Sequence, residues 1–444
     1  MLTGIEWPRV PPGLINWDGW YMPSRYFWRG DALYIFQHQK LVKVLDYPIA
    51  LTHHGKDGNG TLYVRLQWFL HEQWHSVSFP LASLSKHAPS VLSTQGAPLT
   101  SPGLVRRFLS EWYTVNVDRL LPLDVVTQSG WINDQQFVWG GTLIEAGGIS
   151  PHAVDMQLSP FSRWMTYQSV NPAGESTAFP WWTTTVLPKA PHLVLGLALI
   201  GSALLLRPLE RPGFVMHIVD KTSTGKTTSA MLLASILGNP HHAEGLIQPW
   251  RIREHHFAQW LYWMRDSVWF IDDASASSSV FGKRVYLSAD GNTPGYLEGT
   301  RGVTFSSSER YPVQKGGVAA RMVLWPQSLL PFGVPVEAWT RYVLHHPEEW
   351  GWGWTYLLQR FWSHPVEDWK QMWQDHRVDR PNGIAQRWQN HWNTLWCGIR
   401  LWFPPDSVWI RYFLALEADW WQMNLAHEKT LKGIYSPITR GDAS

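Results

Sequence analysis

Cysteine is nearly absent from this sequence: Cys397 is the only one among 444 residues. A single thiol excludes an intrachain disulfide framework and a zinc site built from several cysteines. Such a chain fits a reducing compartment, so we expect the protein to be cytoplasmic. The formal net charge is only +2, which excludes a broadly cationic surface. Contact with nucleic acid would then need a local basic patch or the channel of an oligomer.

Long hydrophobic runs are also missing. The most apolar run, LVLGLALIGSALLL, has 14 residues (193–206), whereas a membrane-spanning helix needs about 20. We therefore expect a buried helix here and no association with a membrane. The opening residues MLTGIEWPRVPPG lack the basic start and apolar centre of a secretory signal.

Tryptophan, in contrast, is abundant, with 31 residues. Trp388, Trp392 and Trp396 are spaced by four, which places them along one stripe of a helix. An apolar stripe at helical spacing usually faces inward. Core packing is therefore favoured over a role in stacking on nucleic-acid bases.

The pattern along the chain predicts three domains. Residues 1–185 are β-rich: TLYVRLQWFL and WHSVSFPL read as a hairpin, and SGWINDQQFVWGG reads as another strand-turn-strand unit. Residues 186–335 alternate strands with helices, which favours an α/β core around a mainly parallel sheet. Residues 336–444 are helical, with prolines between the helices.

The middle segment contains a phosphate-loop pattern between a predicted strand and a predicted helix. The usual motif is G-x-x-x-x-G-K-[ST], and its second half is complete at Gly225, Lys226 and Thr227. Glycine allows the backbone to approach a phosphate, lysine reaches the β- and γ-phosphates, and the threonine hydroxyl binds Mg²⁺. The sequence thus predicts ATP and Mg²⁺ as ligands.

The first glycine of the motif is replaced by Asp220. Aspartate tolerates left-handed backbone better than most residues do, and the backbone N–H remains. Its carboxylate must point away from bound phosphates. We therefore interpret Asp220 as a tolerated variant.

Two further strands end in polar residues. SVWFIDDA has the shape of a Walker B strand, in which Asp272 holds Mg²⁺ and Asp273 activates the attacking water. The alternative is a strand that ends in a solvated turn. GVTFSSSER offers Ser306 or Ser307 as a γ-phosphate sensor.

An arginine is expected to act on the nucleotide of a neighbouring subunit and to stabilise charge in the transition state. Arg321 follows the sensor strand and is the first choice, while Arg310 competes for this role.

These motifs belong to a longer set of residues: DGWY, LYVRLQW and SGW, then STGKTTSAMLLASILGNP, FIDDA, LSADGN and TFSSSE, and later NGIAQRWQNHW. With them the sequence resembles the family catalogued as domain of unknown function 927, found in phages, plasmids and other mobile elements. The resemblance covers most of the chain and is most specific around the phosphate loop. Members commonly have glycine at position 220 and an Asp-Glu pair, so the two departures here bear on the rate of hydrolysis.

The resemblance implies an AAA+-type P-loop ATPase core related to replicative ring helicases. The expected protein is an ATP hydrolase and DNA helicase, a hexamer that moves along single-stranded DNA during replication of a mobile element, plasmid or phage. The first domain would be a DNA-binding collar. Sequence patterns offer no primase, so replication would need a separate one. The residues that would bind phosphates are Ser223, Thr224, Gly225, Lys226, Thr227 and Thr228.

A ring helicase also needs contacts to DNA inside its channel. The stretch FGKRVYLSADGNTPGYLEGTRG, between the Walker B and sensor strands, offers four candidates: Lys283, Arg284, Tyr296 and Arg301. Solvated loop charges are the alternative explanation.

Two other functions compete with the helicase. The first is a nucleotide-gated DNA-binding assembly protein with little ATP turnover, because Asp220 and Asp273 would slow hydrolysis. The second is a small-molecule phosphotransferase, which is disfavoured because no arginine-rich lid follows Asp273. The effect of DNA on ATP turnover distinguishes the helicase from the assembly protein.

Overall fold

The computed structural model describes residues 6–57, 60–94, 96–123, 125–126, 129–150, 155–156, 167–272, 279–291, 301–310, 316–378, 380 and 383–434. The chain divides into two units, one of residues 1–127 with 152–159, the other of residues 128–151 with 160–444. This division differs from the three expected domains. The strands at 130–149 pack with the second unit, and so do the helices beyond residue 336.

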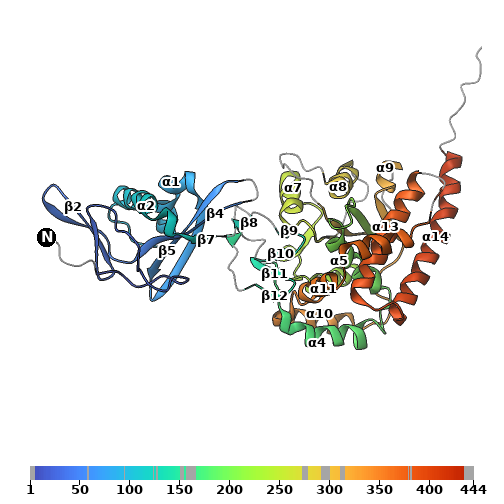
Figure 1. The fold of residues 1–444 in the computed structure, drawn as a ribbon. Coiled ribbons are helices and arrows are strands. Elements are labelled where there is room, and N and C mark those ends of the chain that lie inside the picture. Colours follow the sequence, from blue (N-terminus) through green and yellow to red (C-terminus); the bar gives the residue numbers. More distant parts are fainter. Residues whose placement is uncertain are drawn as a thin grey trace, which may run out of the picture. The chain divides into compact units, whose positions relative to one another are not determined.

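The first unit is built on antiparallel strands with two helices. One sheet has the order β1-β2-β3 and the other β6-β5-β4-β7, in which only β4 and β7 are parallel. Its elements, blue to cyan in Figure 1, are β1 (Tyr26–Arg29), β2 (Ala32–Gln37), β3 (Lys40–Leu45), β4 (Ile49–Lys56), β5 (Leu62–Leu70), β6 (Gln73–Pro80), α1 (Leu84–Thr94), α2 (Pro102–Asn116), β7 (Leu121–Pro122) and the parallel pair β8 (Val125–Val126) and β13 (Asp155–Met156).

The predicted hairpin of the first unit is confirmed. β5 and β6 pair in register from Leu70↔Gln73 onward. Between them His71 and Glu72 both have positive φ, 51° and 62°, as a two-residue hairpin turn with right-handed strand twist requires.

A five-stranded parallel sheet is the centre of the second unit, and it confirms the expected α/β core. The spatial order is β15-β16-β17-β14-β18, and every neighbouring pair is parallel. The strands are β14 (Phe214–Val219), β15 (Ile247–Pro249), β16 (Val268–Asp272), β17 (Val303–Ser308) and β18 (Met322–Trp325).

Helices cover both faces of this sheet. α5 (Leu193–Leu205) and α6 (Lys226–Ser235) contact each other and the strands β16 and β17 on one face. α8 (Ser279–Asp290) contacts β14 and β17 on the other, with α7 (Glu254–Trp263) beside it (Figure 1). All 13 residues of α5 are buried, as its uniform apolar composition predicts. Within the described residues, every helix is too short or too polar to cross a membrane.

The described residues form seven further α-helices in this unit. They are α4 (Glu175–Trp181), α9 (Gly316–Ala319), α10 (Val336–His345), α11 (Gly353–Trp362), α12 (Val366–Asp375), α13 (Gly383–Trp402) and α14 (Val408–Ile434). α13 crosses α5 at a pair of glycines, because a Cβ on Gly201 would lie 2.2 Å from the carbonyl oxygen of Gly398. Trp388 and Trp392 of α13 are buried as predicted, while Trp396 is partly exposed and stacks on His376.

The second unit also contains the SGW stretch, at the start of a small antiparallel sheet. Its strands are β9 (Gly130–Asn133), β10 (Gln136–Trp139), β11 (Thr142–Glu145) and β12 (Gly148–Ile149). The indole N–H of Trp131 donates to the carbonyl of Leu204 (2.9 Å), and its backbone N–H donates to the carboxylate of Asp266 (3.1 Å). Burial raises the pKa of Asp266, and the nearby guanidinium of Arg265 opposes this rise. These bonds explain why the strands belong with the α/β core.

Candidate functional site

Polar residues gather where the strands of the parallel sheet end. Because all five strands run in one direction, their carboxyl ends lie at one edge of the sheet, where α/β proteins usually bind ligands. The loop after β14, the end of β16 and the end of β17 all lie there. The segment that follows β18, residues 326–335, leaves from the same edge.

The loop after β14 combines two residues of positive φ with the start of a helix. Ser223 and Gly225 have positive φ, 63° and 86°, and α6 begins at Lys226. A helix N-terminus presents unpaired N–H groups and the positive end of its dipole, both of which attract anions. A Cβ on Gly225 would come within 3.0 Å of the side chain of Leu330. The positive φ therefore favours glycine here, and a larger residue would also press on Leu330.

Lys226 is turned toward its own loop. Its amine donates to the carbonyl oxygens of Asp220 (2.8 Å) and Lys221 (2.5 Å). Thr224 likewise donates to the carbonyl of Lys221 (2.9 Å). The charged end of Lys226 therefore lies over the loop, where a bound anion would sit.

Asp220 does not have the left-handed backbone that a glycine at this position could adopt, since its φ is not positive. Its carboxylate accepts a hydrogen bond from its neighbour Lys221 (N–H to Oδ1, 2.7 Å) and another from Ser328 (N–H to Oδ2, 2.8 Å). The side chain is thus directed to the segment after β18, and aspartate is accommodated without backbone strain.

Asp272, the last residue of β16, lies opposite the start of α6. Its Oδ2 accepts a hydrogen bond from the hydroxyl of Thr227 (2.5 Å), and its Oδ1 accepts one from Ser307. The structure therefore joins the predicted loop threonine, the predicted Walker B aspartate and one sensor-strand serine in a single group. Asp273 lies outside the described residues.

The two sensor candidates point to opposite faces of β17, and of the two it is Ser307 that faces Asp272. Ser306 is fully buried and its hydroxyl bonds to Nδ1 of His217 (3.1 Å), away from Asp272. Side chains alternate along a strand, so the next residue, Ser307, faces Asp272. Sequence alone did not distinguish the two positions.

His217, in the middle of β14, forms a chain of hydrogen bonds that the sequence did not suggest. The hydroxyl of Ser308 donates to the carbonyl of Arg310 (2.7 Å), so it must accept from Nε2–H of His217 (2.9 Å). Nδ1 then accepts from Ser306. Burial lowers the pKa of His217 to about 3, so the ring is neutral. It fixes the end of β17 against β14.

A cavity of about 470 Å³ lies over the loop. Four of its residues were not among the predicted ones: Thr222, Ser308, Val336 at the start of α10, and Glu309, whose carboxylate accepts a hydrogen bond from Thr222 (2.5 Å). Glu309 was identifiable only as an acidic residue after the serines. The lining residues are Thr222, Ser223, Gly225, Lys226, Thr227, Thr228, Asp272, Ser307, Ser308, Glu309 and Val336.

Arg321 lies at the opposite edge, just before β18 begins. Its guanidinium pairs with the carboxylate of Asp290 through Nε (2.7 Å) and Nη2 (2.9 Å). The second terminal nitrogen, Nη1, donates to the carbonyl of Gly317 (2.8 Å). It also lies over the ring of Tyr286. All three nitrogens are thus engaged within the chain. Arg310 is exposed and follows β17 at the edge that carries the phosphate loop.

The candidate DNA contacts have different environments. Arg284 is buried, donates to the carbonyls of Trp250 and Ile252, and lies over aromatic rings, so it is a structural residue. Arg301 is partly buried and donates to the carbonyl of Arg207 (3.4 Å). Tyr296 lies outside the described residues.

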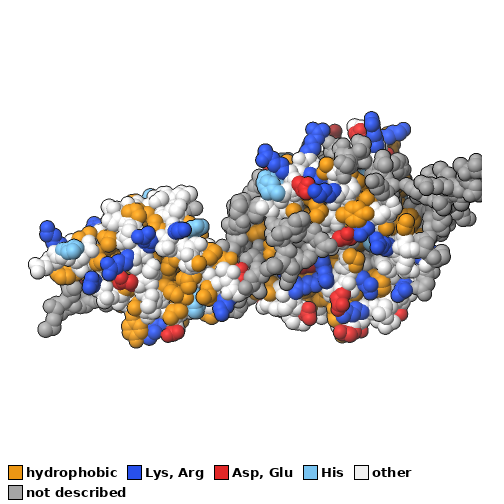
Figure 2. Space-filling model, turned by 90° about the horizontal axis from the view of Figure 1, so that it is seen from above, with side chains coloured by type: hydrophobic (Ala, Val, Ile, Leu, Met, Phe, Trp, Pro, Cys, Tyr) orange, Lys and Arg blue, Asp and Glu red, His pale blue; other side chains and the backbone are white. Residues whose placement is uncertain are grey.

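Of these candidates, Lys283 is well exposed, and it pairs with Glu254 (2.5 Å). On the face drawn in Figure 2, Lys and Arg side chains are scattered among acidic and apolar residues and do not form one patch. The described part of the stretch between Walker B and sensor strands thus contributes one exposed cation.

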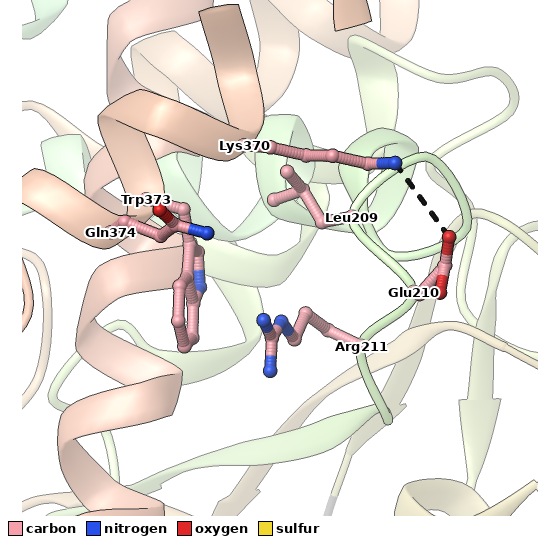
Figure 3. A pocket seen from close by; sticks show the side chains of 6 residues that line it. All are labelled: Leu209, Glu210, Arg211, Lys370, Trp373 and Gln374. Atoms are coloured by element: carbon pink, nitrogen blue, oxygen red, sulfur yellow. Dashed lines mark ion pairs between the residues drawn. The ribbon is translucent and has the colours of Figure 1, made fainter. Parts of the chain in front are cut away.

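Another cavity, of about 280 Å³, lies between α12 and the turn before β14. Figure 3 shows the guanidinium of Arg211 against Trp373, 3.7 Å from the ring centroid, and Lys370 paired with Glu210 at 3.6 Å. Because this turn enters β14 from its amino end, the cavity lies at the edge opposite the phosphate loop. It is separate from the candidate site.

The sequence and the fold were compared with those of known proteins. None of the curated proteins matches this sequence. Among solved structures, the fold is similar to one described as "SCCmec type IV Cch - active helicase", with a TM-score of 0.64 and 15% identity. That likeness covers 91% of this chain and 79% of the other, and at this identity it shows the fold alone. Residues 35–294 match the family described as "Domain of unknown function (DUF927)", which is more than half of the sequence, and the chain therefore belongs to this family.

Proposed function

We propose that this chain is an ATP-driven DNA helicase or translocase with an AAA+-type P-loop core, working as a ring in the replication of a mobile element, plasmid or phage. The observation that carries the proposal is the group formed by Thr227, Asp272 and Ser307 beside the phosphate loop. The helicase part draws on the family and on the solved helicase of similar fold.

The loop residues would bind the phosphates of ATP. Five residues between Ser223 and Thr228 line the cavity over the loop, and the helix dipole of α6 favours an anion there. When phosphates enter, Lys226 exchanges the carbonyls of Asp220 and Lys221 for phosphate oxygens, which carry full charge and form stronger hydrogen bonds. The cavity of about 470 Å³ is within the range of small-molecule sites.

The residues present fit Mg²⁺. Magnesium prefers oxygen ligands and is usually held by one or two protein groups together with substrate phosphates. The Thr227 hydroxyl and the Asp272 carboxylate lie within 2.5 Å of each other, beside the loop. When bound, Mg²⁺ neutralises developing charge on the β- and γ-phosphates. Asp272 would hold the ion, and Ser307 would orient Asp272 from the other side.

Residues around the phosphate loop would take part in hydrolysis, subunit contact and DNA binding. Asp273 takes up the proton of the attacking water, and Glu309 holds Thr222 at the loop. Between the two candidate arginines, we assign the contact with a neighbouring subunit's nucleotide to Arg310, because Arg321 is fully engaged with Asp290 and Gly317. Of the described DNA candidates, Lys283 is the well-exposed one and is assigned to DNA, and a separate primase would act beside the ring.

Steady-state ATP hydrolysis by the purified chain tests this proposal. We expect turnover to require Mg²⁺, to rise with single-stranded DNA and to vanish in Lys226→Ala. Lys283→Ala serves as a second variant that leaves the phosphate loop intact. If DNA does not change turnover in the wild type, the chain is not a DNA-driven motor.

The alternative is a nucleotide-gated, DNA-binding assembly protein with little turnover. The hydrogen bonds of Lys226 to its own loop favour this alternative. They stabilise the loop without a ligand, so nucleotide binding would switch it to a second arrangement. ATP binding with negligible hydrolysis, combined with ATP-dependent assembly, identifies this alternative.

A further inference from the structure

Phe332 is fully exposed, with a relative surface of 108%. It lies in the segment 326–335 between β18 and α10, where Gly333 has a φ of 87° and prolines occur at 331 and 335. A large aromatic side chain that makes no intrachain contact loses the hydrophobic stabilisation of burial. Such a residue at the tip of a constrained segment is suited to contact a ligand.

The segment that carries Phe332 is fixed to the phosphate loop on both sides of it. Before Phe332, the N–H of Ser328 donates to Asp220, and Leu330 packs against Gly225. After it, Val336 begins α10, lines the cavity over the loop, and belongs to a helix that packs on α6. Phe332 is two residues from Leu330 and four from Val336, so the segment that carries it is held beside the cavity, while its own side chain lies outside the lining.

The order of the sheet fixes which way a nucleotide must lie. In the order β15-β16-β17-β14-β18, Asp272 and Ser307 are on one side of β14, and β18 with its following segment is on the other. Asp272 and Thr227 would hold Mg²⁺, which would neutralise charge on the terminal phosphates, so those phosphates would lie on the Asp272 side. The nucleoside would then extend in the opposite direction, toward the segment that carries Phe332.

We propose that Phe332 is the platform on which the base of the bound nucleotide stacks. This inference rests on the proposed nucleotide site and adds its base subsite. Stacking of a base on an aromatic ring is worth about 1–3 kcal/mol and tolerates any base, because each has a π face. Phe332 offers no hydrogen-bonding group to read the edge of the base, so ATP and GTP should bind with similar affinity.

The test is calorimetric titration of the full chain with Mg²⁺ and either ADP or inorganic pyrophosphate. The two ligands share a diphosphate, and only ADP has a base. We expect wild type to bind ADP more tightly, and Phe332→Ala to weaken ADP about tenfold or more while changing pyrophosphate less than about twofold. Phe332→Trp should keep the affinity for ADP. Phe36→Ala, a half-exposed phenylalanine of the first unit, is the matched control.

Each other outcome overturns the inference in a distinguishable way. If Phe332→Ala leaves ADP affinity unchanged, or weakens ADP and pyrophosphate equally, Phe332 does not bind the base. If the variant changes the oligomeric state and keeps the ratio of the two affinities, Phe332 contacts a second copy of the chain instead. If wild type binds neither ligand, the proposed nucleotide site itself fails, and the base subsite fails with it.

Discussion

The carboxylate of Asp220 accepts a hydrogen bond from the backbone N–H of Ser328, which lies 108 residues further along the chain. Asp220 occupies the position where the loop motif has its first glycine. Glycine has no side chain and cannot make this bond. The departure from the motif therefore joins the phosphate loop to the segment between β18 and α10, and the residue contributes to the architecture of the site.

Replacing Asp220 tests this connection. Asp220→Ala leaves the buried N–H of Ser328 without its acceptor, so we expect a loss of about 1–3 kcal/mol in the free energy of unfolding. Asp220→Asn retains one acceptor oxygen and should lose less. Urea denaturation of the three proteins measures both values. Equal stability of the alanine variant and wild type would show that the hydrogen bond is dispensable.

The contact between Thr227 and Asp272 predicts how nucleotide binding depends on magnesium. Thr227→Ala removes one oxygen ligand, and we expect the affinity for Mg²⁺ in the presence of ADP to fall by about 10- to 100-fold. Thr227→Ser keeps the hydroxyl and should resemble wild type. Titration of Mg²⁺ at fixed ADP concentration reports the difference. Matching curves for the alanine and serine variants would contradict a metal contact at Thr227.

His217 predicts how stability depends on pH. Burial lowers its pKa to about 3, whereas the unfolded chain takes up the proton near pH 6.5. The unfolded state therefore binds more protons between these values. The stability that His217 provides is fully present above pH 6.5 and declines by about 1.4 kcal/mol per pH unit as pH falls toward 3.

Variants separate His217 from other titrating groups. Burial also lowers the pKa of His391, to about 4, so it adds a similar slope above pH 4. We expect His217→Gln to be less stable at pH 8 and to lose stability less steeply on acidification. His391→Gln is the comparison. Urea midpoints from pH 4 to 8 give the slopes, and a slope unchanged in both variants would exclude these histidines as its source.

The neighbours Lys283 and Arg284 form a matched pair. Arg284→Ala leaves the carbonyls of Trp250 and Ile252 without their donor and removes packing on Phe257, so we expect a loss of about 2–4 kcal/mol. Lys283→Ala breaks an exposed ion pair and should cost less than about 1 kcal/mol. Thermal unfolding and single-stranded DNA binding are measured on both. A DNA-binding defect in a stable Arg284→Ala protein would contradict its structural role.

Arg310 and Arg321 are predicted to behave differently. Arg321→Ala leaves Asp290 without its partner and should lower stability. Arg310→Ala should keep the stability and the ADP affinity of wild type and lower ATP turnover in the assembled protein. Thermal unfolding and turnover, measured together, distinguish the two. Loss of turnover in an Arg321→Ala protein of normal stability would return the role to Arg321.

Local sequence patterns predicted the parts of the site that depend on neighbours along the chain. The spacing of Gly225, Lys226 and Thr227 is set by one turn between a strand and a helix. Asp272 ends an apolar strand, which is visible in the sequence. The choice between Ser306 and Ser307 was not predictable, since a register shift of one residue exchanges the two faces of a strand.

The fold was predictable to a similar degree. Alternating strands and helices indicated the parallel sheet, and the apolar run indicated the buried helix α5. The division into two units was not predictable, because Trp131 belongs to the second unit through hydrogen bonds with Leu204 and Asp266, which are far away in the sequence. The exposure of Phe332 was also not predictable, since it depends on how the other elements of the fold pack around its segment.

The crossing of α5 and α13 has a consequence for biosynthesis. α5 is apolar on every side, and α13, which covers it, is translated almost 200 residues later. Until residues 383–402 leave the ribosome, α5 has no permanent partner on that face, and β14 gains its neighbours β17 and β18 only at residues 308 and 325. Contacts so distant along the chain form slowly and leave apolar surface open to aggregation. Fragments that end before α13 should therefore accumulate in inclusion bodies or bound to chaperones, even though they contain the whole phosphate loop.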